Sequence, residues 1–319
     1  MDVLTLLKES GATRFSLETY PPKTKRAKGE PGFQEHISKI FETIERLMPY
    51  RPLFVSVTYN PEGMTKATSI PIASIIKQRF DIEALAHLTC IGTPKEQIGR
   101  TLDVLEYFGI ENILALRGDP PKPVPAPEPG SGALSGMGCA PLVADKGGPG
   151  MRHSSELVEL ISGSGHRFCI GVAAYPEGHP ECVREDGERD LARDMLNFKR
   201  KVDMGARFAI SQLFLDNDKY FGFVHRAREE GIDIPILPGI MPLINYRNLR
   251  IVRNLCGVAV PHTLLKKLEE NKDDPAEIME IGIEHAVHQC KGLMDKVPCI
   301  HFYAMNMAEP TERILKALS

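Results

Sequence analysis

Short apolar runs alternate with longer amphipathic stretches along this chain of 319 residues. Most of the apolar runs are hydrophobic on both alternating faces, which is typical of strands that helices cover on both sides. Apolar residues spaced three and four apart predict helices between these runs, including two short ones within 245–271. The strand-like runs span 14–20, 53–60, 83–91, 112–119, 168–176, 208–216, 234–242 and 300–306. The other helical stretches span 33–48, 94–109, 191–206, 221–231, 275–294 and 309–318.

Eight strands that alternate with helices predict an α/β fold, a (β/α)8 TIM barrel, in a single domain over 1–319. The main alternative is an open doubly wound sheet. Such a sheet normally carries a Gly-x-Gly-x-x-Gly turn after its first strand. The nearest string, "GSGALSG" at 130–136, has a different spacing and follows prolines rather than a strand. The barrel is therefore the favoured interpretation.

Residues 120–150 interrupt this alternation. They hold eight prolines and seven glycines in 31 residues, a composition that excludes a regular helix or strand. The strand rhythm continues on both sides, so the segment is not a domain boundary. We expect a flexible insertion after the fourth strand, and a functional lid is the alternative.

Composition narrows the function classes. A net charge of −3 provides no basic excess for nucleic acid, and no run of about 18 apolar residues could span a membrane. The first residues lack a secretory pattern, and seven scattered cysteines without a Cys-x-x-Cys pair fit reduced thiols in a cytoplasmic protein. His285, His288 and Cys290 are close in sequence, but Cys290 would point away from the other two on a helix. We therefore expect no metal site.

Polar residues gather where the predicted strands end, which is where barrels of this type carry their active sites. Glu18 lies among apolar neighbours, so its pKa should be raised as a general acid requires; the alternative is a buried arginine partner. The amide of Gln212 could recognise a heterocycle. An adhesion role for Arg117-Gly118-Asp119 is disfavoured, because the apolar lead-in anchors this triplet to a strand. The other strand-end candidates are Thr58, His87, Thr89, Tyr175, Glu177 and His179.

Ordered motifs then carry a family resemblance. The blocks "FSLETYPPK", "VSVTYN", "AHLTCI", "ILALRGDPP", "VAAYPEGHPE", "LNFKRKVDMGA", "AISQLFLD", "PILPGIMPL" and "HFYAMN" are similar to those of methylenetetrahydrofolate reductases and follow the family's order. This resemblance implies a barrel that holds FAD. It also implies a hydride relay in which NADH or NADPH reduces the flavin, and 5,10-methylenetetrahydrofolate then accepts hydride to become 5-methyltetrahydrofolate.

The resemblance also implies roles for individual residues. Glu18 matches the general acid that assists opening of the folate's imidazolidine ring, Asp119 matches a carboxylate near flavin and pterin, and Gln212 matches the residue that orients the pterin. Arg200 and Lys201 suit a pyrophosphate by their charge. The flavin-contacting positions are Thr58, His87, Arg117, Gly118, Asp119, Tyr175, His179, Asp194, Asn197, Arg200 and Lys201.

The chain departs from the family pattern at several positions. Thr19 and Tyr20 follow the glutamate where two aromatics are usual, and His153 and Ser154 stand where a tyrosine and an alanine commonly contact the flavin. Val252 lies near the position where some relatives place a phenylalanine against the nicotinamide. The sequence ends after the eighth strand, so we expect the bacterial type, without the C-terminal S-adenosylmethionine-responsive domain of eukaryotic members.

Two alternative functions stay open at this point. One is a barrel lyase or methyl-group transferase that binds a pterin without redox chemistry. The other is a reductase subunit that receives electrons from a partner protein. Barrels of this kind often associate, so a homo-oligomer is also an expected state.

Overall fold

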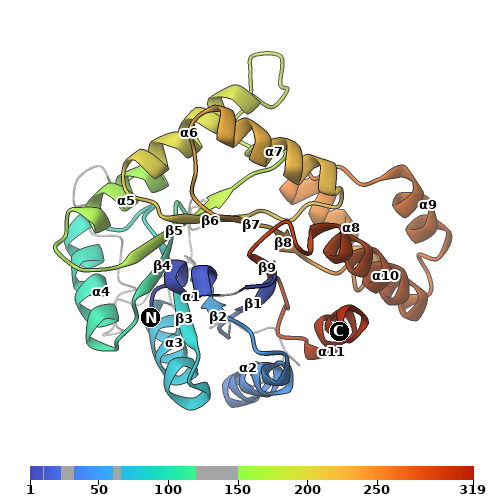
Figure 1. Cartoon of the computed structure of the whole chain (residues 1–319), viewed down its shortest axis with the longest axis horizontal. Helices are drawn as coiled ribbons and strands as arrows, with labels where there is room; N and C mark the ends of the chain where they lie inside the picture. Colours follow the sequence, from blue (N-terminus) through green and yellow to red (C-terminus); the bar gives the residue numbers. More distant parts are fainter. Residues whose placement is uncertain (10, 23–31, 60–65, 120–149) are drawn as a thin grey trace, which may run out of the picture.

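Parallel strands form the centre of the molecule, and helices surround them (Figure 1). The computed structural model describes residues 1–9, 11–22, 32–59, 66–119 and 150–319, so nearly all of the predicted insertion at 120–150 lies outside the described residues. The strands are β1 Arg14–Thr19, β2 Phe54–Val57, β3 Glu83–Thr89, β4 Asn112–Leu116, β5 Cys169–Ala174, β6 Phe208–Ser211, β7 Ile236–Leu237, β8 Gly239–Ile240 and β9 Cys299–Phe302.

These strands close into a barrel. All neighbours pair in parallel, and β1 pairs with β2 on one side and with β9 on the other. β7 pairs with β6, whereas β8 pairs with β9, and only Pro238 separates β7 from β8. Proline has no backbone N–H to donate, but the Pro238 carbonyl accepts from the N–H of His301 at 2.9 Å. β7 and β8 are thus two halves of the predicted strand 234–242, and the predicted eight-stranded barrel is confirmed.

Helices follow the strands as the periodicity predicts. They are α1 Val3–Glu9, α2 Phe33–Leu47, α3 Lys66–Phe80, α4 Lys95–Tyr107, α5 Ser154–Ser162, α6 Leu191–Asp203, α7 Asn217–Glu229, α8 Tyr246–Ile251, α9 His262–Glu270, α10 Pro275–Leu293 and α11 Ala308–Leu318. The segment 245–271 forms short helices as expected, with a π-helical turn at Val252–Cys256 between α8 and α9. α1, α3 and α5 were not among the predicted helices: α1 has only seven residues, α3 contains Pro71, and α5 has only nine residues. None of the described helices is both long and apolar enough to cross a membrane.

The barrel interior is packed at its amino-terminal end. Phe54, Leu85 and Phe208 form a buried cluster there, and Val3 and Leu7 of α1 join it. In Figure 1, α1 lies over the centre of the ring of strands. This end of the barrel is therefore closed by side chains, which leaves the carboxyl-terminal end of the strands for chemistry.

Candidate active site

A cavity of about 480 Å³ opens at the carboxyl-terminal ends of the strands. Residues from the ends of β1 to β6 and β9 contribute to its wall, which is the arrangement that a barrel imposes on strand-end side chains. Tyr20, Cys256 and Tyr303 also line it, although sequence reasoning did not single them out for the wall. Tyr303 directly follows the last strand within "HFYAMN", and this strand-end position could have identified it as a residue of the cavity wall. The predicted site residues in this wall are Glu18, Thr58, His87, Thr89, Arg117, Gly118, Asp119, Tyr175, His179 and Gln212.

A second cavity of about 380 Å³ adjoins the first. The two share the lining residues Leu116, Arg117, Ala173, Tyr175 and His179, so they form one continuous, two-part site. Predicted residues found only in the second part are His153, Ser154, Asp194, Asn197, Arg200 and Lys201. The structure thus brings these residues to one of the two cavities, whereas Glu177, another strand-end candidate, is not in the wall of either. Glu181 and Arg193 line the second cavity without having been predicted.

Glu18 is a buried carboxyl group without a cationic partner among the residues that the structure describes. It is 5% exposed, and burial raises its pKa to about 7, while a hydrogen bond with the Tyr20 side chain partly opposes this shift. The nearest imidazole nitrogen, His87 Nε2, lies 3.6 Å from Oε2. Burial lowers the pKa of His87 to about 3, so this imidazole is neutral at physiological pH. Among the described residues, Glu18 therefore contacts the phenol of Tyr20 and the neutral imidazole of His87. The alternative of a buried arginine partner is not observed among these residues.

Two polar atoms on β3 are left free at this cavity. Nε2 of His87 and Oγ1 of Thr89 are buried and have no hydrogen-bond partner among the described residues, and both residues line the wall. Buried polar groups are normally hydrogen-bonded, because leaving them unpaired costs free energy. A ligand with polar ring atoms would satisfy them.

The side chain of Gln212 is held by a hydrogen bond from the backbone of the next residue. Its Oε1 accepts from the N–H of Leu213 at 2.8 Å, and its backbone N–H donates to the Ala174 carbonyl at 2.7 Å. The amide oxygen already accepts this hydrogen bond, which orients the side chain, and the NH2 group can donate to a ligand in the cavity.

The Arg117-Gly118-Asp119 triplet lies where the two cavities meet. Gly118 has φ +82°, and a Cβ there would lie 2.9 Å from Cβ of Thr89. A larger residue would therefore strain both the backbone and the packing. Arg117 forms a bidentate ion pair with Glu181, with Nη2 to Oε1 at 2.8 Å. This pair lowers the pKa of the Glu181 carboxyl.

Helix α6 forms one side of the second cavity, through Arg193, Asp194, Asn197, Arg200 and Lys201. Asp190 caps its start, and the spacing of Asp194, Asn197 and Lys201 places them on one helix face. Oδ2 of Asp194 accepts from the backbone N–H of His179 at 3.2 Å. Lys201 Nζ donates to the Ala173 carbonyl at 2.6 Å, and burial lowers the pKa of Lys201 to about 8 while Asp194 partly opposes the shift. Cationic and hydrogen-bonding groups of this kind suit a phosphorylated ligand.

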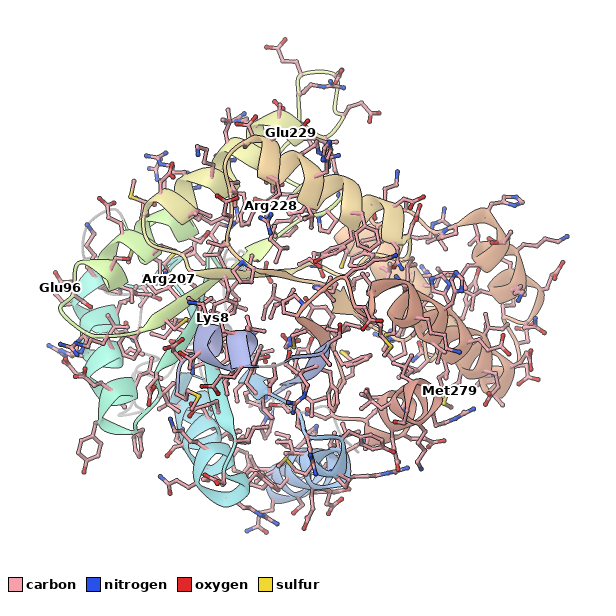
Figure 2. The ribbon with its side chains drawn as sticks, in the orientation of Figure 1. Lys8, Glu96, Arg207, Arg228, Glu229 and Met279 are labelled. Carbon is pink, nitrogen blue, oxygen red and sulfur yellow. The ribbon has the colours of Figure 1, made fainter. Side chains whose placement is uncertain are left out.

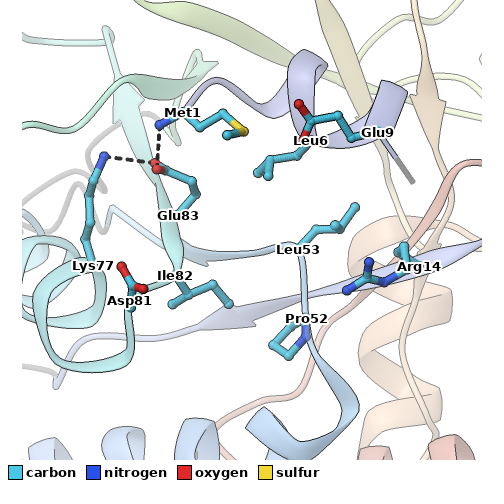
Figure 3. Close-up of a pocket in the computed structure, with 10 residues that line it drawn as sticks. All are labelled: Met1, Leu6, Glu9, Arg14, Pro52, Leu53, Lys77, Asp81, Ile82 and Glu83. Carbon is cyan, nitrogen blue, oxygen red and sulfur yellow. Dashed lines mark hydrogen bonds and ion pairs between the residues drawn. The ribbon is translucent and has the colours of Figure 1, made fainter. Parts of the chain in front are cut away.

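Other hollows lie at the amino-terminal end of the barrel. Figure 3 shows one between α1 and the strands, where Lys77 Nζ pairs with Glu83 Oε2 at 3.0 Å. A neighbouring groove is lined by Lys8 and Arg207, which Figure 2 labels near the centre of the view. In barrels of this type the amino-terminal end contributes stability rather than catalysis, so we assign no chemistry to these hollows.

His285 and Cys290 of α10 have a structural environment. His285 Nε2 lies 2.9 Å from the Leu215 carbonyl, and Cys290 is fully buried. Within the described part of the chain, no group of three or more histidine, cysteine, aspartate or glutamate side chains could hold a metal ion.

Comparison with known proteins gives the family. A model of the family "Methylenetetrahydrofolate reductase" matches residues 4–319. This chain belongs to the methylenetetrahydrofolate reductase family. It is 33% identical to 5,10-methylenetetrahydrofolate reductase of Escherichia coli, over 98% of this chain and 93% of that protein. It is also 33% identical to methylenetetrahydrofolate reductase (NADH) 1 of Arabidopsis thaliana, over 100% of this chain and 50% of that protein.

The relatives of this reductase family differ in length. The chain spans about half the length of the plant and yeast relatives that it matches, such as 50% of the Arabidopsis protein. Among solved structures, an uncharacterised protein from Clostridium thermocellum that binds two copies of 5-methyl-5,6,7,8-tetrahydrofolic acid matches with a TM-score of 0.61 and 12% identity. That match covers 99% of this chain and 96% of the other, and at this identity it shows a shared fold.

The structure also places the residues that depart from the reductase family's pattern. Thr19 is buried, and its Oγ1 donates to the Ser56 carbonyl at 3.2 Å, so it stabilises the sheet. Tyr20 lines the first cavity and hydrogen-bonds with Glu18. Val252 lies in the same wall, and His153 and Ser154 lie at the start of α5 beside the second cavity.

Proposed function

We propose that this chain reduces 5,10-methylenetetrahydrofolate to 5-methyltetrahydrofolate, with FAD as cofactor and NADH or NADPH as hydride donor. The observation that carries the proposal is Glu18, a buried acid with a pKa of about 7, in one cavity with Gln212 and Asp119. That cavity continues into one lined by Arg200 and Lys201. Membership of the reductase family supports the same reaction.

The residues present fit a flavin dinucleotide. A ring system with polar edges would satisfy Nε2 of His87 and Oγ1 of Thr89, which are buried without a partner in the described structure. A diphosphate would find Arg200 and Lys201 in the adjoining cavity. Both cavities fall within the range of about 300–1,000 Å³ that is usual for ligand sites. Bound FAD would carry hydride from the nicotinamide to the folate in two successive half-reactions.

The remaining steps belong to the chain's own side chains. Glu18, about half protonated near pH 7, holds a proton that can pass to a ring nitrogen of the folate as its carbon–nitrogen bond breaks. The carbon released from that bond becomes electrophilic and accepts the hydride. The NH2 of Gln212 would orient the pterin, and Asp119 at the cavity edge would face the pterin and the flavin.

An absorbance spectrum of the purified protein, followed by anaerobic addition of NADH or NADPH, tests the proposal. We expect a yellow protein that bleaches with one donor and recovers its colour when methylenetetrahydrofolate is added. A yellow protein that neither nicotinamide bleaches would point to a partner protein as electron donor. A colourless protein that FAD cannot reconstitute would refute the flavin mechanism and favour a non-redox pterin enzyme.

Substitution of Glu18→Gln separates the two half-reactions. Glutamine keeps the size of the side chain but has no proton to donate, so folate reduction should fall by about 10²-fold or more. Reduction of the flavin by the nicotinamide should be nearly unchanged, because that step needs no acid. Stopped-flow absorbance measures both rates, and in the wild type the rate of folate reduction should fall as pH rises through about 7. If Glu18→Gln turns over folate at the wild-type rate, the acid is another residue.

A further inference from the structure

A π-helical turn forms part of the wall of the first cavity. The turn, Val252–Cys256, follows α8 directly, and Val252 and Cys256 line the cavity. Val252 is fully buried. A π-helical turn is rare and is frequently found at functional sites. We call residues 252–256 the π-turn.

Arg189 ties the π-turn to the loop that follows β5. Its Nη2 donates to the Cys256 carbonyl at 2.9 Å, while Nη1 donates to the carbonyls of Glu177 at 3.0 Å and Gly178 at 2.7 Å. All three acceptors are neutral backbone groups. The guanidinium therefore joins two segments that lie about 80 residues apart in the sequence, as Glu177 and Cys256 do.

The backbone at Arg189 is itself held in place. Arg189 pairs with Val183 in an antiparallel bridge, and the N–H of the next residue, Asp190, donates to the Cys182 carbonyl at 2.8 Å. Asp190 also caps α6. Arg189 thus projects from a fixed hairpin, which Figure 1 shows as the loop that leads into α6.

Two further features fit this tie. Oε2 of Glu177 accepts from the N–H of Ala259 at 3.0 Å, so the chain just after the π-turn is fastened to the same loop. Gly257 has φ +58°, and a Cβ on it would overlap Nη2 of Arg189. The guanidinium fits only because position 257 has no side chain.

We propose that Arg189 is a positioning residue that holds the π-turn against the cavity and thereby sets the affinity for the pterin substrate. The inference rests on the proposed function, in which a nicotinamide and a pterin occupy this cavity in turn. Arg189 does not line the first cavity, so it acts through Val252 and Cys256. A wall that contacts the substrate equally before and during hydride transfer affects KM more than kcat.

Arg189→Ala tests this role in the FAD-loaded enzyme. We expect KM for methylenetetrahydrofolate, and Kd for 5-methyltetrahydrofolate by titration calorimetry, to rise about tenfold, since charged hydrogen bonds are typically worth that much. The value of kcat should change by less than about threefold, and FAD content should stay the same. Arg189→Lys keeps the charge and one donor, so it should recover part of the affinity.

Arg184→Ala is the matched control. Arg184 lies on the same hairpin, but its guanidinium pairs with Asp186 at 3.3 Å and is exposed to solvent. Its removal should leave KM, Kd and kcat unchanged. A similar loss of affinity in Arg184→Ala would mean that the whole hairpin, rather than the tie to the π-turn, is responsible.

Gly257→Ala tests the same contact between Arg189 and the π-turn by changing the residue that the guanidinium packs against. Its Cβ should displace the guanidinium and weaken folate binding as Arg189→Ala does. The double variant should bind folate no more weakly than the worse single variant, because both remove one interaction. Hydrogen exchange of residues 252–261 should be faster in all three.

The outcomes separate this inference from the proposed function. An active wild type with unchanged folate affinity in Arg189→Ala would overturn the positioning role, even if hydrogen exchange rose. Equal losses of kcat, FAD content and thermal stability would show a general structural role instead. A wild type that binds 5-methyltetrahydrofolate but has no reductase activity would refute the proposed reaction, while the Kd comparison would still test Arg189. A wild type that binds no folate would overturn both.

Discussion

At the scale of single residues, burial sets the protonation state of Glu18. It lies on β1 inside the barrel, among Tyr20, a neutral His87 and apolar side chains. Burial without a cation favours the protonated form, which is why its pKa rises to about 7. The same burial makes the ionised form costly to the fold.

The stability of the protein should therefore depend on pH through Glu18. Its pKa is raised above the unfolded value, so its favourable contribution is present at low pH and is lost as pH rises through about 7. The cofactor-free wild type should lose on the order of 2 kcal/mol relative to Glu18→Gln between pH 5 and pH 8. Urea unfolding at the two pH values measures this difference. A difference that does not change with pH would contradict the raised pKa.

A second residue-scale prediction concerns Lys201. Lys201→Met removes a charge from the second cavity and should weaken FAD binding by about tenfold or more, most strongly at low salt. Because burial lowers the pKa of Lys201 to about 8, the charged form is already disfavoured in the fold, so FAD-free stability should change little. Fluorescence titration with FAD and thermal unfolding measure the two quantities.

Lys199→Met is the control for this prediction. Lys199 lies two positions earlier on α6, and its Nζ donates to the Glu230 carbonyl rather than lining the second cavity. Its removal should leave FAD affinity unchanged. Equal effects at both positions would indicate that the net charge of α6, and not Lys201 itself, attracts the cofactor.

At the scale of elements, strands β5 and β6 fit each other through one glycine. Gly171 pairs in register with Phe208, and a Cβ on Gly171 would overlap the Phe208 ring. Phe208 is fully buried in the cluster that fills the barrel. A glycine normally weakens a strand, but here it makes room for an aromatic ring.

Gly171→Ala should consequently destabilise the protein by about 1–3 kcal/mol through overpacking. Phe208→Leu removes the overlap, so the double variant should lose less stability than the two single variants together. Denaturant unfolding of the four proteins gives the interaction free energy. Strict additivity would mean that the ring moves aside without strain.

Element boundaries were less predictable than element types. The predicted strand 234–242 is divided at Pro238, because proline cannot donate to a neighbouring strand. The predicted strands 53–60 and 208–216 are shorter in the structure, at Phe54–Val57 and Phe208–Ser211. Their polar ends leave the sheet to line the cavity, as Thr58 and Gln212 do.

At the scale of the whole molecule, one end of the barrel is packed with side chains and the other carries the candidate site. The amino-terminal end is closed by α1, which Asn112 holds: its Oδ1 accepts from the N–H of Val3 at 2.8 Å. Asn112 is fully buried. The carboxyl-terminal end carries both cavities of the candidate site.

Asn112→Ala should separate stability from activity. It leaves a buried N–H without a partner and should cost about 1–3 kcal/mol of unfolding free energy. KM for the folate should be unchanged, since the site lies at the other end of the barrel. Denaturant unfolding and steady-state kinetics measure the two effects. A changed KM would show that closure of the amino-terminal end is coupled to the site.

The sequence by itself determined the alternation of strands and helices, the closed barrel and the gathering of polar residues at strand ends. These features follow from periodicity and chain order, which each segment carries locally. Roles for Asp119, Gln212 and the flavin-contacting residues stay predictions, because they depend on bound molecules.

Only the tertiary structure decided which residues meet. It placed Tyr20 and His87, rather than an arginine, beside Glu18, and it brought Arg189 to the carbonyl of Cys256. It also set Gly171 against Phe208. These contacts join residues that are distant in sequence, or depend on the surroundings that closure creates. The raised pKa of Glu18 was predicted from its apolar neighbours, but a hydrogen bond to a distant backbone carbonyl leaves no periodic signal in the chain, since it exists only once the barrel has closed.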